Sequence, residues 1–223
     1  MGSTDVRSDL KAILRVPTYW IIVAENMLAS IGVWMFFNWM PLYFKETFGM
    51  GLTAAGFSGT FLFQSAVIGI SGGGFLSDRF TKDHPNRRMF LLGGFYLASA
   101  PLLLIFLGKP AYLPLAVFMF LSSLLRNIGQ SNEGPVMCDV LAPRRRALAM
   151  GMMNCCTMTS GGLGVFAAGY LKKDFGLGGV FAGVSAAILV AGALTLIGAV
   201  WFYPRDMARA QSANSMRTSL SVT

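Results

Sequence analysis

The chain has 223 residues, of which 54% are hydrophobic and only 13% are charged, and its formal net charge is +8. A soluble domain usually carries about a quarter of charged residues, so this composition excludes a soluble globular enzyme, and its hydrophobicity excludes an intrinsically disordered chain. The basic residues lie in short segments between long apolar runs, whereas a nucleic-acid-binding protein gathers them on a polar face. The composition therefore predicts a protein embedded in a lipid bilayer that does not bind nucleic acid.

Long apolar segments follow one another along the chain. A helix needs about 20 apolar residues to cross a hydrocarbon core of roughly 30 Å, and six segments meet this requirement, which predicts an all-α polytopic membrane protein. The predicted spans cover residues 18–43, 52–77, 89–107, 111–140, 148–170 and 178–203. Together they form one transmembrane domain over residues 18–203, between an N-terminal segment 1–17 and a C-terminal tail 204–223. In the fourth span, Pro135 is expected to kink the helix because it has no backbone N–H.

The distribution of lysine and arginine predicts the orientation. If the N-terminus lies inside, most of the 18 basic residues fall in inside segments, and the outside loops hold only Lys45, Lys109, Lys172 and Lys173. Because basic residues concentrate on the cytoplasmic side of membrane proteins, we expect both termini in the cytoplasm. The expected location is a plasma membrane, the inner membrane in a bacterium.

Glycine pairs inside the spans predict close helix packing. Gly69 and Gly73 stand four residues apart, and so do Gly179 and Gly183. Small residues at this spacing allow two helix backbones to approach each other in lipid. The pattern favours a compact bundle over separate membrane anchors.

The sequence holds no arrangement typical of a metal centre or an enzyme active site. Its three cysteines have no metal-ligand spacing, and its single histidine, His84, lies in a polar loop. We therefore predict no metal, no cofactor and no enzymatic activity.

Three ionisable residues fall at membrane depth: Glu25 in the first span, and Arg126 and Glu133 in the fourth. Such residues are costly in a bilayer and mark functional sites by default. Arg126, Gln130 and Glu133 stand at i, i+4 and i+7, on one face of a helix. This face is expected to point into the bundle or into a watery cavity.

The first interpretation of these residues is a substrate cavity. A guanidinium group binds a carboxylate or a phosphate through two parallel hydrogen bonds, so Arg126 and Gln130, with Asn38 and Gln64 from the first two spans, are the predicted substrate-binding residues. Glu133 or Glu25 would then carry a coupling ion or proton. The alternative is that Arg126 and Glu133 form a buried ion pair that only specifies helix packing.

The loop between the second and third predicted spans carries a family motif. The run from Gly72 to Phe80 ends in Asp78-Arg79 and is followed by Arg87-Arg88. With Gly74, these residues resemble the cytoplasmic loop signature of the major facilitator superfamily, although the spacer before the basic pair is longer than usual. Spacers of this length resemble the second copy of the signature, in the C-terminal half of these transporters.

A second stretch extends the resemblance. Residues 139–143, Asp-Val-Leu-Ala-Pro, are followed by Arg146 and by Ala149-Met150-Gly151, and they resemble the tenth and eleventh helices of the anion:cation symporter branch. Carriers of sugar acids and related organic anions belong to this branch. The resemblance implies that Gly74, Asp78, Arg79, Arg87, Arg88, Asp139 and Arg146 form a conformational gate, whose ion pairs form in one state and break in another.

The resemblance also implies a twelve-helix transporter, of which this chain would supply one half, built from two inverted three-helix repeats. The expected partners are the bilayer, a small anionic substrate and a second six-helix half, which is either the rest of a longer product or another copy. The expected function is secondary transport of an organic anion coupled to protons or sodium. Two alternatives stay open: an efflux carrier of amphipathic compounds, and a six-helix remnant or scaffold that does not transport.

Overall fold

The computed structural model describes the backbone of residues 6–82 and 84–222, and their side chains except at 60–63 and 213–222. The described residues are almost entirely helical and include no strand, which confirms the all-α prediction. The elements are α1 (Val6–Leu14), α2 (Pro17–Phe48), α3 (Leu52–Ser58), α4 (Thr60–Thr81), α5 (Arg87–Ser99), the 3-10 helix η1 (Ala100–Gly108), α6 (Tyr112–Gln130), α7 (Glu133–Val140), α8 (Pro143–Trp201) and α9 (Tyr203–Val222).

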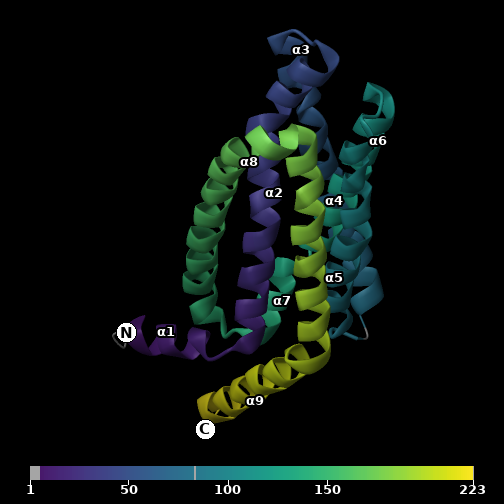
Figure 1. Cartoon of the computed structure of the whole chain (residues 1–223). Helices are drawn as coiled ribbons and strands as arrows, with labels where there is room; N and C mark the ends of the chain where they lie inside the picture. The colour runs from purple at the N-terminus through teal and green to yellow at the C-terminus, as the bar shows by residue number, and fades with distance from the viewer. Residues whose placement is uncertain (1–5, 83, 223) are drawn as a thin grey trace.

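Helices long and apolar enough to cross a membrane make up most of the bundle. Among the described residues, four segments qualify: Pro17–Phe48, Arg87–Gly108, Tyr112–Val140 and Pro143–Trp201. The last has 59 residues, and its backbone leaves the helix at Gly176 (φ 65°, ψ 167°). In Figure 1 the two arms of α8 run down from this turn with α2 between them in the view. The integral membrane character is thus confirmed, and the count of six spans stays a prediction.

The turn inside α8 corrects one predicted loop. Lys172 and Lys173 were expected in an outside loop, but they lie in the last helical turns before Gly176. Glycine adopts a left-handed φ without the steric cost that a Cβ brings, so one residue is enough to reverse the chain. The Nζ atom of Lys172 lies 2.7 Å from Oε1 of Glu46 on α2, which ties the two helix ends together.

The fourth predicted span is interrupted, as its proline suggested. α6 ends at Gln130 and α7 begins at Glu133, so the break falls at Ser131 and Asn132. In an unbroken helix the N–H of residue 135 would bond the carbonyl of Ser131, and Pro135 has no N–H to offer. The break places Glu133 at the first turn of a new helix.

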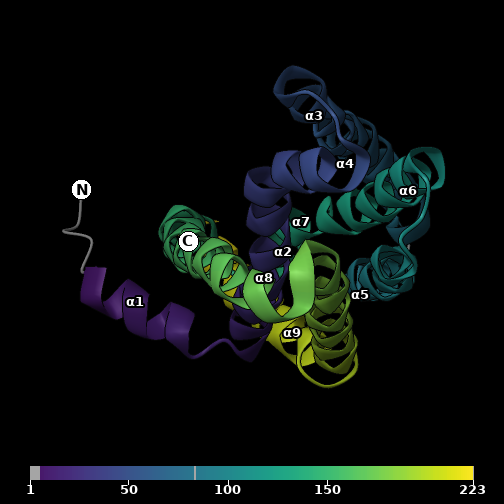
Figure 2. The ribbon, with the colours of Figure 1, turned by 45° about the horizontal axis from the view of Figure 1, so that its top comes forward.

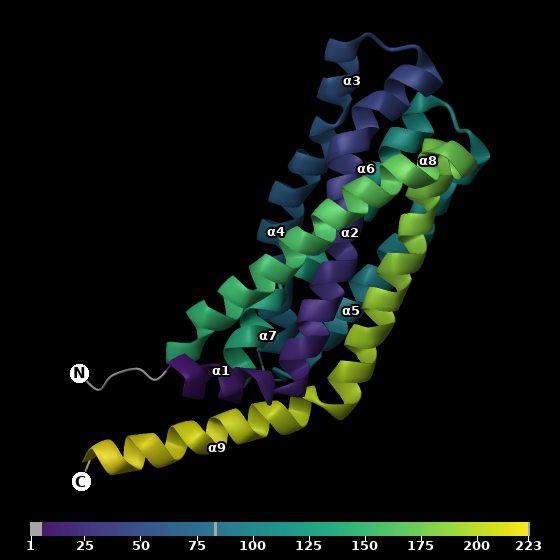
Figure 3. The ribbon, with the colours of Figure 1, turned by 60° about the vertical axis from the view of Figure 1, so that its left-hand side comes forward.

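The two ends of the chain lie on the same face of the bundle. α1 and α9 both run across this end, away from the axis of the long helices (Figures 1 and 3). The segments predicted as an N-terminal segment and a C-terminal tail are therefore helices over most of their length, while residues 1–5 and 223 lie outside the described part of the chain.

The bundle has two packed sides, and α5 joins them because it packs against both α8 and α6. α2 packs chiefly against α8, and α4 packs chiefly against α6. Seen from an inclined direction, α2 lies between α8 on one side and α4 and α6 on the other (Figure 2). The largest fully buried side chains include Tyr19, Tyr96, Tyr203, Phe44 and Phe181.

One of the two predicted glycine pairs is a close helix contact. A Cβ at Gly73 would lie 2.8 Å from the backbone of Ile128, and one at Gly69 would lie 2.6 Å from the Cβ of Asn127. The first pair therefore lets α4 approach α6, as predicted. The prediction is wrong for Gly183, because a Cβ there would meet no atom of the chain within 4 Å.

Candidate functional site

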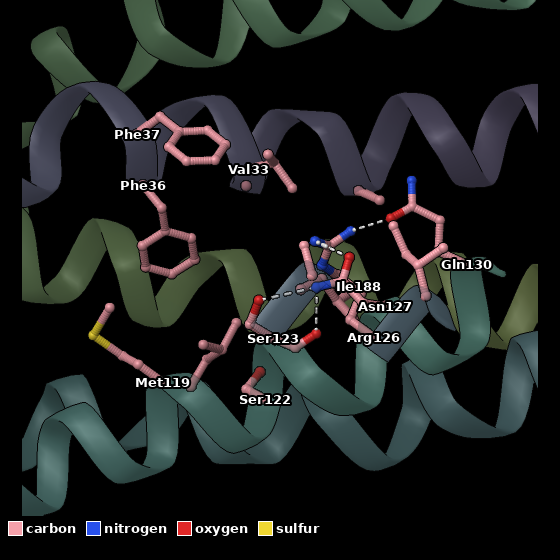
Figure 4. A pocket seen from close by; sticks show the side chains of 15 residues that line it. Val33, Phe36, Phe37, Met119, Ser122, Ser123, Arg126, Asn127, Gln130 and Ile188 are labelled. Atoms are coloured by element: carbon pink, nitrogen blue, oxygen red, sulfur yellow. Dashed lines mark hydrogen bonds between the residues drawn. The ribbon is translucent and has the colours of Figure 1, made fainter. Parts of the chain in front are cut away.

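A pocket of about 260 Å³ lies between α2, α4 and α6, with one residue each from η1 and α8. Its lining comprises Ala29, Gly32, Val33, Phe36, Phe37, Ala66, Ile70, Leu103, Met119, Ser122, Ser123, Arg126, Asn127, Gln130 and Ile188. In Figure 4, the side chain of Phe36 on α2 points toward the helix α6, which carries Met119 and Ser123. The pocket is thus an apolar space with a polar group of residues on one helix.

Arg126 is the charged residue of the pocket lining. Its Nη1 donates to Oε1 of Gln130 at 3.2 Å, and its Nη2 donates to Oδ1 of Asn127 at 3.3 Å (Figure 4). Both acceptors are neutral amide oxygens. No ion pair of Arg126 occurs within the described part of the chain, so its guanidinium is oriented without being neutralised by direct contact.

Two of the predicted substrate-binding residues line this pocket, and two do not. Arg126 and Gln130 face it, whereas Asn38 and Gln64 are exposed and lie outside its lining. The Nδ2 of Asn38 donates to the carbonyl of Trp34 on its own helix at 2.8 Å. Gln64 precedes the lining residue Ala66 by two positions, which is a rotation of roughly 200° around a helix.

Asn127 and Ser123 belong to the same polar group but were missed in the sequence. Asn127 donates from Nδ2 to the carbonyl of Ser123 at 2.8 Å, and the hydroxyl of Ser65 on α4 donates to that of Ser123 at 2.7 Å. The available clue was local, because the stretch 122–132 is unusually rich in polar residues for a membrane span.

Two carboxyl groups lie buried beside the pocket, toward the end of the bundle that carries α1 and α9. Glu133 accepts a hydrogen bond from Nδ2 of Asn26 at 2.5 Å and another from the hydroxyl of Tyr96 at 3.3 Å. Glu25 is fully buried, one helical turn before the lining residue Ala29. Glu133 interacts with Arg126 electrostatically but forms no direct ion pair with it in the described structure.

The predicted gate residues gather at the same end of the bundle. Arg88 Nη1 lies 3.1 Å from Oδ2 of Asp139, and the hydroxyl of Tyr203 donates to the same oxygen at 2.7 Å. Arg88 also approaches the exposed Asp78 at 3.9 Å. This cluster joins α4, α5, α7 and the start of α9, and Tyr203 is a member that the sequence analysis missed.

The other predicted gate residues take different positions. Arg146 donates to the carbonyls of Leu141 at 3.2 Å and Cys138 at 2.7 Å, so it binds the end of α7 rather than a carboxylate. Arg79 and Arg87 are exposed, and Gly74 has open space where a Cβ would stand. The close contact of α4 with α6 is therefore at Gly73 and not at Gly74.

The N-terminal helix is held to the bundle by a buried carboxylate. Oδ1 of Asp9 on α1 lies 2.7 Å from Nη2 of Arg144 and 2.8 Å from Nε of Arg145. The hydrogen bond from Arg145, reinforced by the charge and hydrogen bond of Arg144, lowers the pKa of Asp9 below its usual value despite some desolvation. Arg144 and Arg145, in the first turn of α8, thus hold α1 against the bundle through Asp9.

Comparison with known proteins gives the family. A family model described as "Major Facilitator Superfamily" matches residues 4–220, and no curated protein matches. Two similar solved structures are of a bacterial homolog to the human lysosomal transporter Spinster. The inward-facing unoccupied form has a TM-score of 0.58 at 16% identity over 94% of this chain, and the occupied form 0.54 at 17% over 88%.

The lengths of the matched proteins differ from that of this chain. The chain spans 53% and 50% of those two solved transporters, about half of their length. At this level of identity the likeness establishes the fold, and the family model extends over almost the whole sequence. The chain belongs to the major facilitator superfamily.

Proposed function

We propose that the chain is one half of a secondary transporter for a small organic anion, such as a sugar acid or another carboxylate, driven by a proton or sodium gradient. The observation that carries the proposal is Arg126, a guanidinium held by two amide oxygens at the wall of an apolar pocket. Charges taken out of water are usually paired, so a half-buried guanidinium that has no direct ion pair in the described structure supports an anionic ligand.

The chemistry of the lining supports a carboxylate with a less polar body. A guanidinium can bind both oxygens of a carboxylate at once, while Gln130 and Asn127 hold its plane in position. The opposite wall, with Phe36, Phe37 and Met119, offers apolar contact for the rest of the ligand. Ligand pockets commonly combine apolar walls with a few placed polar groups in this way.

The proposed partner is a second six-helix half, either in the same product or as another copy of this chain. The support is that this chain spans about half of two solved transporters of the same fold. The predicted roles of Asn38 and Gln64, which are exposed outside the pocket, then require that the second half bring substrate within their reach.

The cluster around Arg88 and Asp139 is proposed as the conformational gate, with Gly74, Asp78, Arg79, Arg87 and Arg146 around it. Its support is that one ion pair joins the ends of several helices, so that a change in helix arrangement would break it. The end that carries this cluster is proposed to face the cytoplasm, with both termini, in a plasma membrane, since basic segments favour that side.

Binding and flux of a labelled hexuronate test the proposed function in vesicles that contain the 223-residue chain. We expect Arg126→Ala to weaken hexuronate binding about 10- to 100-fold, because a hydrogen bond to a charged group contributes about 1.5–3 kcal/mol. Arg126→Lys should recover part of the affinity, since lysine keeps the charge but lacks the planar fork. Lys173→Ala, which removes an exposed positive charge near the Gly176 turn, is the matched control.

Two results would contradict the proposal. Equal hexuronate binding by wild type and Arg126→Ala would contradict the assignment of Arg126 to an anion site. Binding without flux, in the presence of any second half that copurifies, would favour a six-helix scaffold that does not transport.

A second candidate function is efflux of amphipathic cations, which the apolar pocket wall and the nearby carboxyl groups favour. In that case Arg126 would serve packing only, and Glu133 would attract the cation. Cationic dye efflux that is lost in Glu133→Gln and kept in Arg126→Ala would support this candidate over the first.

A further inference from the structure

Glu25 is a carboxyl group with no hydrogen-bond donor. Its side chain is fully buried within α2, and neither Oε1 nor Oε2 accepts a hydrogen bond from a described residue. The ionisable groups that face it come from three other helices: Tyr96 of α5, Arg126 of α6 and Glu133 of α7. Tyr96 interacts with Glu25 as well, but the hydrogen bond that its hydroxyl donates goes to Oε1 of Glu133.

Glu133 is in the opposite situation, because two donors hold it. Nδ2 of Asn26 donates to one oxygen at 2.5 Å and the Tyr96 hydroxyl donates to the other at 3.3 Å. The Asn26 amide is itself oriented, since Thr157 on α8 donates to its Oδ1 at 3.2 Å. The amide oxygen of Asn26 can only accept hydrogen bonds, so its contact with the Thr157 hydroxyl turns the amide nitrogen toward Glu133.

These two environments favour different protonation states. An ionised carboxylate needs donors when it leaves water, and the penalty for an unpaired buried charge is far greater than that for a neutral polar group. Two neighbouring carboxyl groups that are both ionised also repel each other in a medium of low polarity. Arg126 attracts both carboxyl groups, so the donors decide, and the single negative charge of the pair is best placed on Glu133, which has two of them.

We propose that Glu25 is a proton-binding site, which holds its proton in this conformation while Glu133 stays ionised. A role of Glu25 in coupling rests on the proposed transport function. The protonation of Glu25 does not depend on that function. Release transfers the proton from the Glu25 O–H to a water molecule and leaves a carboxylate. The new carboxylate then needs a hydrogen-bond donor. Either the Tyr96 hydroxyl or a water molecule supplies this hydrogen bond when the helices move.

Infrared spectroscopy of the 223-residue chain in lipid membranes tests the assignment. At neutral pH we expect a C=O stretching band of a protonated carboxyl group that resists exchange with bulk water. This band should vanish in Glu25→Gln and persist in Glu133→Gln. Glu46→Gln is the matched control, because Glu46 is an exposed, lysine-paired glutamate at the far end of the same helix, and it should leave the band unchanged.

Either of two spectra would overturn the assignment. A band that is lost in Glu133→Gln and kept in Glu25→Gln would place the proton on Glu133. A wild-type spectrum without the band would mean that both groups are ionised. Since glutamine replaces glutamate with almost no change in volume, a thermal melting curve for each variant shows whether a lost band reflects a lost fold.

Flux measurements separate this inference from the proposed function. With labelled hexuronate, we expect a pH gradient to accelerate uptake in wild type but not in Glu25→Gln. Acceleration by a sodium gradient at equal pH, lost in Glu25→Gln, would overturn the proton assignment in favour of a sodium site. If wild type transports no hexuronate but shows the infrared pattern, the proposed function fails and the proton-binding site stands.

Discussion

Asp206 caps the start of α2 by binding Thr18, which lies 188 residues earlier in the chain. Its Oδ2 accepts hydrogen bonds from the backbone N–H of Thr18 at 3.0 Å and from the hydroxyl of Thr18 at 2.7 Å. The first N–H groups of a helix have no partner inside it, and a carboxylate there also complements the helix dipole. The start of α9 therefore fixes the start of α2, where the first membrane segment emerges from the bundle face that carries both termini.

Loss of this cap should destabilise the protein. Asp206 and Thr18 are both buried, so Asp206→Ala leaves a buried N–H and a buried hydroxyl unpaired, at a cost of about 1–3 kcal/mol. We expect a lower melting temperature in a fluorescence-monitored thermal unfolding experiment in detergent. Asp174→Ala, an aspartate at an exposed position, should leave it unchanged, and equal melting of the two variants would count against the cap.

The hydroxyl of Tyr203 should stabilise the cluster around Asp139. Tyr203→Phe removes the hydroxyl that donates to Asp139 at 2.7 Å and also lies 3.4 Å from the Pro85 carbonyl, and it leaves Arg88 in place. We expect a loss of about 1.5–3 kcal/mol, the range for a bond to a charged acceptor. Thermal unfolding measures it. Tyr170→Phe removes a hydroxyl from an exposed tyrosine and serves as control, and an equally small effect of both changes would show that the Tyr203 contact is not stabilising.

Substitution of neighbouring glycines should have opposite effects. In Gly73→Ala the new Cβ would lie 2.8 Å from the backbone of Ile128, which cannot move aside as a side chain would, so we expect overpacking to destabilise the protein by about 1–3 kcal/mol. Gly72→Ala meets open space and should be neutral or stabilising by up to about 1 kcal/mol, since alanine is the better helix former. Chemical or thermal unfolding of both variants decides, and a destabilised Gly72→Ala beside an unaffected Gly73→Ala would refute the close contact.

The docking of α1 should depend on pH in the acid range. The pKa of Asp9 is lower when folded than its usual value of 3.8, so its contribution to stability is complete above that value and is lost as the pH falls through the folded pKa. Pulsed hydrogen exchange with mass spectrometry should show that residues 6–14 lose protection below about pH 4. In Asp9→Asn this acid step should disappear, and an unchanged step in that variant would assign it to another group.

Most of the helices of the bundle could be predicted from the sequence, because insertion into a membrane constrains the composition and the backbone hydrogen bonding of each segment. A span must be apolar over about 20 residues and must satisfy its backbone internally, so the long helices and the interruption before Pro135 could be predicted. The turn at Gly176 falls between the predicted spans 148–170 and 178–203, but it is a single residue rather than a loop, because the chain on both sides of it is helical. The N-terminal segment and the C-terminal tail were predicted without an assigned secondary structure, and they contain the helices α1 and α9.

The site was predicted only in part. Arg126 and Gln130 were found because four residues along one helix make one turn, a relation that the sequence contains. Asn26 and Tyr96 were missed because their role arises from Glu133, which lies 107 and 37 residues away. A polar residue beside an ionisable one, as Asn26 is beside Glu25, is the clue that the sequence offered.

By itself the sequence determined that the chain forms long apolar helices, which face of a helix is polar and which superfamily motif the loop carries. Only the tertiary structure decided which of the buried charges meet. It left Arg126 without a direct carboxylate contact, gave two donors to Glu133 and gave none to Glu25. The physical reason is that hydrophobic periodicity is a property of one helix, whereas the state of a buried charge depends on the donors that other helices bring to it.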